Sequence, residues 1–251
     1  MLMKNVNSDI AYEYIRKRIL SGEFPPARAL MTNALADEIG VSRTPVRDAL
    51  RQLEVDGLVT IQARLGASVK TMDIKEFREM CELRLALESH AAGLAARDHD
   101  ELELREMRFA IDTMRSLTER IQAGGEEQPL LSELVREDVR FHVALMTTAK
   151  NDLMKSEILR LHLINRVVSG PTPGESNPQL DRARRDERRQ LVLAEHEAIY
   201  RAVEQSDAPA AKAAMERHLQ GIIDLNLVAM GRGSAGFIAR QLTEEEMSYS
   251  A

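Results

Sequence analysis

The sequence predicts a mainly α-helical protein, with a small N-terminal domain followed by an all-α domain. Three observations support this. Apolar residues recur at helical spacing between residues 35 and 58, apolar and polar residues alternate over residues 58–69, and long helical patterns without strand signals follow from about residue 73. We therefore expect domains at residues 1–72 and 73–230 and a C-terminal tail at residues 231–251.

Charge and composition narrow the classes of protein. The net charge is −6, but residues 1–70 carry 10 Lys and Arg against 8 Asp and Glu, so the remainder carries −8. A mildly basic N-terminal part on an acidic body is compatible with local DNA contact. The sequence contains no run of about 18 apolar residues, so no membrane span is expected, and it shows no signal-peptide core. The single cysteine, Cys81, excludes an intrachain disulfide and favours a cytoplasmic protein.

The chain should begin with two short helical segments. Asn7 or Ser8 can cap a first helix, which ends near the Ser21-Gly22 pair. Thr32 is expected to cap a second helix.

Residues 35–58 contain the most informative pattern. They predict two helices separated at Gly40. One face of the later helix is apolar, with Val46, Ala49, Leu50 and Leu53. The opposite face carries Arg43, Thr44, Arg47 and Arg51. A buried helix, a tight turn and a basic helix are how a helix-turn-helix presents side chains to the major groove.

The segment after this helix completes a winged helix-turn-helix. Residues 58–69 read as two short strands, with Gly66 in the turn and Arg64 near the tip. We expect Arg43, Thr44 and Arg47 to read base edges or phosphates. Ser42 would contact a phosphate or cap the helix, and Arg64 with Gly66 would place the wing on the DNA backbone or in the minor groove.

The segment GVSRTPVRDAL, residues 40–50, resembles the signature of the GntR superfamily of bacterial winged-helix transcription regulators. Asp48 stands where that family more often has Glu. The resemblance implies DNA binding and makes Asn33 a further candidate for contact with the DNA backbone.

Six long helices are expected in the second domain. Their approximate ranges are 73–98, 100–123, 131–149, 152–169, 180–206 and 208–230. Loops are expected at residues 123–125 and 169–174. Asn151 and Asp207 occupy positions where helix N-caps are expected.

Four polar residues occupy apolar stripes of these helices: Asp138, His142, His196 and His218. Burying them without partners would cost several kcal/mol. Either each is a separately hydrogen-bonded core residue, or all four converge on a divalent metal ion, which takes imidazole and carboxylate ligands readily. We favour the metal because four such residues occur together, two of them one helical turn apart. Zinc is the first candidate, with nickel and manganese as alternatives.

A second resemblance covers most of this domain. The segments ELRLALESHAAGLAA, DVRFHVAL, EHEAIYRAVEQSD and AAMERHL resemble the ligand-binding FCD domain of the FadR-type branch of GntR regulators. In metal-binding members, the matching positions hold the ion, and they fall on the same four residues. The resemblance also implies a bundle of six or seven helices around an effector pocket.

Two more polar residues interrupt apolar stripes. Arg84 could bind an effector carboxylate or pair with an internal acid, either Glu88 or Asp138. Asn165 could bind an effector or brace a neighbouring helix. The remaining histidines, His90, His99 and His162, are expected at the surface or in ordinary packing. The charged run 182–189 is expected to be the solvated start of a helix.

Together these patterns predict a metabolite-responsive transcription regulator that acts as a cytoplasmic homodimer. The resemblance to the family implies that it is a repressor on a palindromic double-stranded DNA operator. A small carboxylate effector, such as an organic or sugar acid, would bind beside the metal and release the repressor. The alternative is a helical-bundle metalloenzyme acting on a small organic acid. The absence of an HExxH pattern and of an additional general base disfavours it, so no catalytic residue is assigned. A protein-binding module that uses the helix-turn-helix for protein contact is a third possibility.

Overall fold

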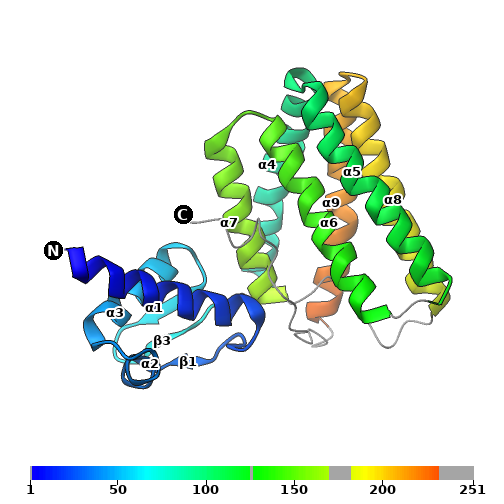
Figure 1. Ribbon diagram of the computed structural model, residues 1–251. Helices are drawn as coiled ribbons and strands as arrows, with labels where there is room; N and C mark the ends of the chain where they lie inside the picture. Colours follow the sequence, from blue (N-terminus) through cyan, green and yellow to red (C-terminus); the bar gives the residue numbers. More distant parts are fainter. Residues whose placement is uncertain (1, 125–126, 170–181, 232–251) are drawn as a thin grey trace.

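The chain forms a small N-terminal group of elements and a bundle of long helices (Figure 1). The structure, a computed structural model, describes residues 2–124, 127–169 and 182–231. The predicted tail lies outside the described residues from residue 232 on. The predicted loops lie outside them at residue 125 and at residues 170–174.

The N-terminal group, called the head below, is a winged helix-turn-helix. Its helices are α1 (Leu2–Ser21), α2 (Thr32–Ile39) and α3 (Arg43–Val55), and its strands are β1 (Ala29–Leu30), β2 (Val59–Gln62) and β3 (Gly66–Val69). The strands form an antiparallel sheet in the order β1-β3-β2, with Val59 opposite Val69 and Gln62 opposite Gly66. The predicted hairpin is therefore confirmed.

Local sequence explains the geometry of the head. Gly40 ends α2 in the left-handed conformation at φ +78°, which a residue without a Cβ adopts at little cost. The turn between β2 and β3 uses Arg64 at φ +69° and Gly66 at φ +93°. The predicted inner face of α3 is buried against the rest of the head: Val46, Ala49, Leu50 and Leu53. The opposite, basic face of α3 is therefore left at the surface.

Two expectations for the head were wrong, and one strand was not predicted. Helix α1 begins at Leu2, so Asn7 and Ser8 lie inside it and do not cap it, in keeping with the good helix formers that precede them. Thr32 is the first residue of α2, and Met31 occupies the N-cap position without a side-chain cap. Strand β1 was not expected at all. It has two residues, too few for alternation to register, and its pairing with β3 brings the chain to Met31 in an extended conformation.

The bundle consists of six helices within the described residues: α4 (Ile74–Asp98), α5 (Glu101–Gln122), α6 (Glu127–Thr148), α7 (Asp152–Ser169), α8 (Arg182–Glu204) and α9 (Ala208–Gly231). Asp73 and Asp100 begin α4 and α5 in capping boxes. Asn151 and Asp207 accept the expected cap hydrogen bonds. The predicted ranges agree with these helices within four residues at each end.

Helix α7 joins the bundle to the head. The Arg166 guanidinium donates a 2.9 Å hydrogen bond from Nε to the Leu20 carbonyl oxygen at the end of α1. His162 lies four residues before Arg166 on the same helix. Between these two residues, Ile164 packs against Gly57 of the head. Within the described residues, no helix is both long and apolar enough to cross a membrane.

Candidate metal centre and DNA-contact surface

The outer face of α3 carries the predicted DNA-contact residues. Asn33 on α2, Ser42 and Arg43, Thr44 and Arg47 on α3, and Arg64 and Gly66 of the wing are all exposed. Ser42 occupies the N-cap position of α3, but its side chain makes no cap hydrogen bond. Among the described residues, neither Arg43 nor Arg47 has an ion-pair partner, whereas Arg51 pairs with Asp48 at 3.6 Å. Two guanidinium groups are thus available to an anionic partner on one helix face.

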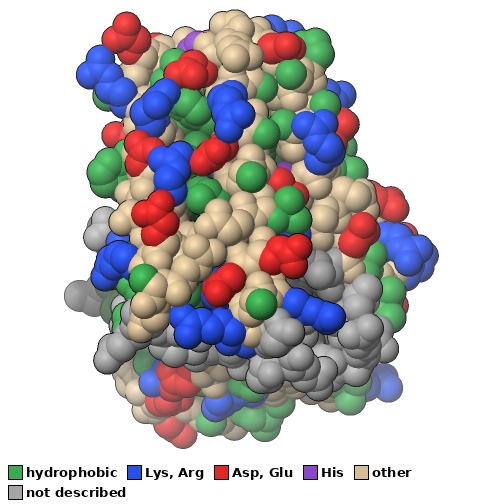
Figure 2. Space-filling view, turned by 90° about the vertical axis from the view of Figure 1, so that its right-hand side faces the viewer, with side chains coloured by type: hydrophobic (Ala, Val, Ile, Leu, Met, Phe, Trp, Pro, Cys, Tyr) green, Lys and Arg blue, Asp and Glu red, His purple; other side chains and the backbone are tan. Residues whose placement is uncertain are grey.

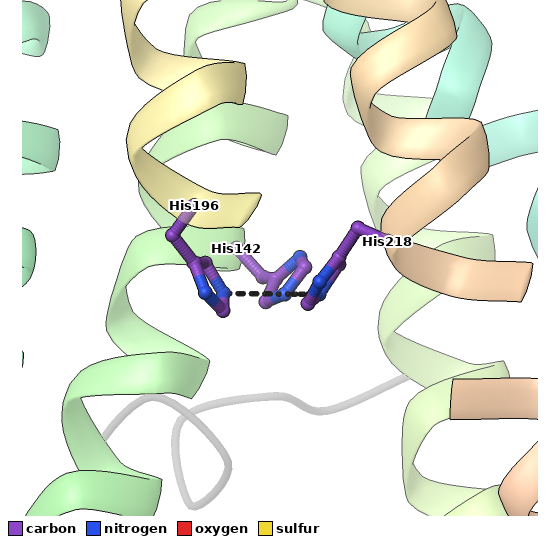
Figure 3. Close-up of side chains that lie close together, drawn as sticks. All are labelled: His142, His196 and His218. Atoms are coloured by element: carbon purple, nitrogen blue, oxygen red, sulfur yellow. Dashed lines mark hydrogen bonds between the residues drawn. The ribbon is translucent and has the colours of Figure 1, made fainter. Parts of the chain in front are cut away.

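Three histidines from three helices meet inside the bundle. His142 comes from α6, His196 from α8 and His218 from α9, and each is at most 4% exposed. Their rings point toward one another (Figure 3). One ring nitrogen from each lies within 4.8 Å of the corresponding nitrogen of the other two.

The spacing of these nitrogens fits a small metal ion. The Nε2 atom of His142 lies 3.4 Å from Nε2 of His196 and 3.3 Å from Nε2 of His218. Ligand nitrogens at the usual zinc distance in a tetrahedral site are about 3.3 Å apart. Asp138 adds a carboxylate oxygen, Oδ1, at 3.2 Å from His196 Nε2. All four predicted ligands are therefore together.

The outer ring nitrogens have partners that orient two of the imidazoles. His196 Nδ1 lies 2.8 Å from the Val192 carbonyl oxygen, and His218 Nδ1 lies 3.0 Å from Glu195 Oε2. A proton on Nδ1 satisfies these acceptors and leaves the Nε2 lone pair directed at the centre. Metal-ligating histidines are oriented in this way.

The electrostatics favour neutral imidazoles beside a charged carboxylate. Burial lowers the pKa of His142 to about 3 and also lowers the pKa of His218. Burial alone would raise the pKa of Asp138, but its hydrogen bond with His196 and the nearby histidines bring that pKa below its usual value. A divalent cation requires these protonation states.

A second polar cluster lies beside His142, on the side of α4 and α7. Glu88 is 1% exposed, and its Oε1 accepts a 2.9 Å hydrogen bond from Arg84 Nε and lies 2.9 Å from His162 Nε2. Its Oε2 lies 3.8 Å from His142 Nδ1. Burial disfavours the Glu88 carboxylate, but His162 and Arg84 bring its pKa below the usual value.

A cavity lies beside Asp138 and is lined by residues of α5, α6, α8 and α9. It opens to solvent, and the empty space in and in front of it amounts to about 650 Å³. Its walls are Met114, Thr118, Leu134, Val135, Asp138, Arg188, Arg189, Val192, Leu193 and Ile222. Asp138 thus belongs both to the cavity wall and to the cluster of candidate ligands.

Comparison with known proteins identifies both parts of the chain. Residues 7–69 match the bacterial regulatory proteins of the gntR family, and residues 79–221 match the FCD domain. The chain belongs to the GntR family of transcription regulators. FCD domains are known for metal binding, which agrees with the three histidines that converge here.

Relatives and solved structures agree. The chain is 30% identical over 233 residues to the transcriptional regulator LutR of Bacillus subtilis, covering 82% of this chain and 95% of LutR. It is 27% identical over 218 residues to the transcriptional repressor RspR of Escherichia coli, covering 86% of this chain and 87% of RspR. The fold resembles that of E. coli McbR/YncC, with a TM-score of 0.63 and 18% sequence identity. The match covers 90% of this chain and 98% of the McbR/YncC chain. This GntR regulator is therefore a metabolite-responsive DNA-binding protein, and the metalloenzyme alternative is not favoured.

The two predicted effector residues do not line the described cavity. Arg84 is buried on α4 and pairs with Glu88, one of the two internal acids considered from the sequence. Asn165 is half-buried on α7. Their role in effector binding remains a prediction.

Two polar groups, one beside the histidines and one in the cavity wall, were not predicted from the sequence. His162, expected at the surface or in packing, contacts both Arg84 and Glu88. The charged run 182–189 does begin a helix, but Arg189 is only 3% exposed, so that stretch is not wholly solvated as expected. On the bundle face shown in Figure 2, the described Lys and Arg side chains are interspersed with Asp and Glu, which indicates no extended nucleic-acid surface there.

Proposed function

We propose that this GntR regulator is a homodimeric repressor whose DNA binding is controlled by a small carboxylate bound beside a divalent metal ion. The observation that supports it most directly is the convergence of three buried Nε2 atoms, two of them on rings oriented by Nδ1 partners, next to a carboxylate and a cavity. Regulators of this family act as dimers. The expected division is a head at residues 1–72, an effector domain at 73–230 and a tail at 231–251, in a cytoplasmic protein.

The proposed ligands of the ion are Asp138, His142, His196 and His218. Zinc is the first candidate because the two nitrogen separations of 3.3 and 3.4 Å match a tetrahedral zinc site; nickel and manganese are the alternatives. When bound, such an ion supplies a Lewis-acidic contact for an effector carboxylate. The chain's own contribution is to aim the three imidazoles at one point and, by burial, to keep His142 and His218 neutral.

Metal analysis of the purified protein tests this site. We expect about one ion per chain in the unmodified protein and a loss of the ion in His196→Ala and His218→Ala. His90, exposed on α4, provides the matched control, because His90→Ala should retain the ion. Full occupancy in both His196→Ala and His218→Ala would reject the proposed centre.

On the DNA side, Arg43, Thr44 and Arg47 would read base edges or phosphates from the N-terminal part of α3. Ser42 and Asn33 would contact the backbone, and Arg64 with Gly66 would place the wing. Two heads in a dimer would match a palindromic operator. Footprinting tests this: Arg47→Ala should lose protection of the operator, and normal protection by this variant would count against the assignment.

The route between the two sites would be α7. One turn of this helix contacts the Glu88 cluster through His162, and the next turn holds the head through Arg166 and Ile164. A ligand that moves α6 or α4 relative to α7 would thereby change how the two heads of a dimer are presented to the operator. Such a linkage is a coupling free energy between two distinct sites.

A further inference from the structure

The cavity beside the candidate metal centre is lined by charged as well as apolar side chains. Asp138 contributes a carboxylate next to His196. Arg188 and Arg189 of α8 contribute guanidinium groups. Leu134, Val192, Leu193 and Ile222 are among the apolar walls. A molecule in this cavity would therefore meet both the carboxylate beside the candidate metal centre and positive charge.

The two arginines differ in how their charge is balanced. Arg189 is 3% exposed and pairs with Asp186, from Nη2 to Oδ1, at 2.5 Å. Arg188 has no ion-pair partner among the described residues, and its Nη2 atom is buried without a hydrogen-bond acceptor. A buried donor on a charged group that lacks an acceptor costs free energy, which an anion in the cavity would remove. Arg188 therefore carries the uncompensated positive charge of this cavity.

A nearby carboxylate does not neutralise Arg188. Glu195 comes within 3.9 Å of the Cβ position of Gly221, as do both terminal nitrogens of Arg188, yet the two side chains form no ion pair. Oε2 of Glu195 is instead 3.0 Å from His218 Nδ1, where it orients that ring. Glu195 is thus committed to the metal centre.

The guanidinium of Arg188 also lies close to the candidate metal ligands along α9. Gly221, beside this guanidinium, follows His218 by three residues, or about 4.5 Å of helix rise. A short carbon chain bridges such a separation when each end carries its own anionic group.

We propose that the effector has two anionic groups, and that Arg188 binds the one distal to the metal. This proposal rests on the proposed metal centre and carboxylate effector, and narrows the effector to a short dicarboxylate. One carboxylate would approach the ion, the other would accept hydrogen bonds from the guanidinium, and the methylene chain would lie against the apolar walls. The planar fork of an arginine suits a carboxylate bound in a bidentate manner.

Matched pairs of acids test the second anionic group. The zinc-loaded full-length protein is titrated calorimetrically with glutarate and valerate, and with succinate and butyrate, so that the members of each pair differ by one carboxylate. We expect at least one dicarboxylate to bind ten-fold or more tightly than its partner acid. Arg188→Gln should abolish that preference and leave the affinity for the monocarboxylate unchanged.

Arg184→Gln is the control, because Arg184 is exposed on the same helix and lies outside the cavity wall. Circular dichroism and zinc content verify that both variants fold and retain the ion. Equal affinity for mono- and dicarboxylates, or a preference that survives in Arg188→Gln, would overturn the dianion proposal and leave the carboxylate effector intact. Binding of none of the four acids would reject the short-carboxylate effector itself, and the dianion proposal with it.

Discussion

The contact between Gly57 of the head and Ile164 of α7 gives a quantitative prediction about how the head is attached to the bundle. Gly57 has φ +79°, and a Cβ added there would lie 2.6 Å from Ile164 Cδ1 and 3.1 Å from Cγ1. Gly57→Ala should therefore destabilise the protein in two ways. The left-handed backbone costs a non-glycine residue about 1–2 kcal/mol, and the overlap with Ile164 adds a further penalty.

A double-mutant cycle separates the two penalties. Ile164→Val removes the nearest atom, Cδ1, and should itself cost about 0.5–1.5 kcal/mol. In that background Gly57→Ala should cost little more than the backbone penalty, so the two changes should be coupled by about 1 kcal/mol. The measurement is the free energy of unfolding in urea for the four proteins. A cost of Gly57→Ala that is the same with Ile and with Val at position 164 would show that the head and α7 are not in tight contact, and would undermine α7 as the coupling element.

Three other predictions concern the head, the metal and the DNA. Tyr12→Phe removes a buried 2.7 Å hydrogen bond to Asp56 Oδ2 and should cost about 1.5–3 kcal/mol at neutral pH. Burial raises the pKa of Asp56 above its usual 3.8, and the hydrogen bond from Tyr12 opposes that rise. Without this bond the pKa of Asp56 in the folded protein is higher still. The loss of unfolding free energy in Tyr12→Phe, measured in urea, should therefore grow as the pH rises above 3.8 and shrink below it. A chelator should lower the melting temperature of the metal-loaded protein, with zinc restoring it, whereas His218→Ala should melt at the same temperature with and without chelator. Arg43→Ala should reduce the slope of log K against log salt for operator binding by about 1 if it contacts a phosphate, and an unchanged slope would exclude that contact.

Periodicity located the candidate ligands because burial and chemistry conflicted at those positions. His142, His196 and His218 each continue an apolar stripe, and a bundle buries such stripes whatever the side chain is. Turn chemistry likewise located the caps at Asn151 and Asp207. These features depend on neighbours within one or two helical turns, which the sequence contains directly.

Features that depend on contacts between distant segments could not be located in this way. Strand β1 exists only because Ala29 and Leu30 pair with β3, almost 40 residues later. His162 lies at the edge of its stripe, with a side chain 24% exposed, and its partner Glu88 is 74 residues away. His162 nevertheless follows the buried Ile158 by four residues, and this helical spacing could have suggested that His162 faces the interior.

The charged run at the start of α8 is a further case in which the sequence interpretation was incomplete. Seven of the eight residues 182–189 are arginines or acids, which is the composition of a solvated surface. Nevertheless, a buried stripe with spacings of four, three and four runs through Arg189, Leu193, His196 and Tyr200. The stripe was detectable, but the composition outweighed it. Long side chains can be buried along their stems while their charge is paired, here with Asp186.

The Glu88 cluster leads to a final prediction, because one buried carboxylate serves three neighbours. Glu88 Oε1 lies within 2.9 Å of both Arg84 Nε and His162 Nε2, and Oε2 faces His142 Nδ1 at 3.8 Å. Glu88→Gln leaves the shape unchanged but removes the charge that balances Arg84. Removing one partner of a buried ion pair costs about 3–5 kcal/mol. Glu88 Oε2 and His142 Nδ1 are buried and face each other without a hydrogen bond. We expect this carboxylate to orient the imidazole when a metal ion is bound, so its loss should lower metal affinity about 10- to 100-fold.

A second variant distinguishes the loss of charge from the loss of support for His142. Arg84→Met together with Glu88→Gln removes both charges of the pair, so much of the stability lost in Glu88→Gln should return. Metal affinity should stay low, because the carboxylate facing His142 Nδ1 is still absent. Urea unfolding of the chelated proteins and competition with a zinc indicator measure the two quantities separately. If metal affinity recovers together with stability, Glu88 acts only through the balance of charge with Arg84; if neither quantity falls in Glu88→Gln, the cluster does not support the metal centre.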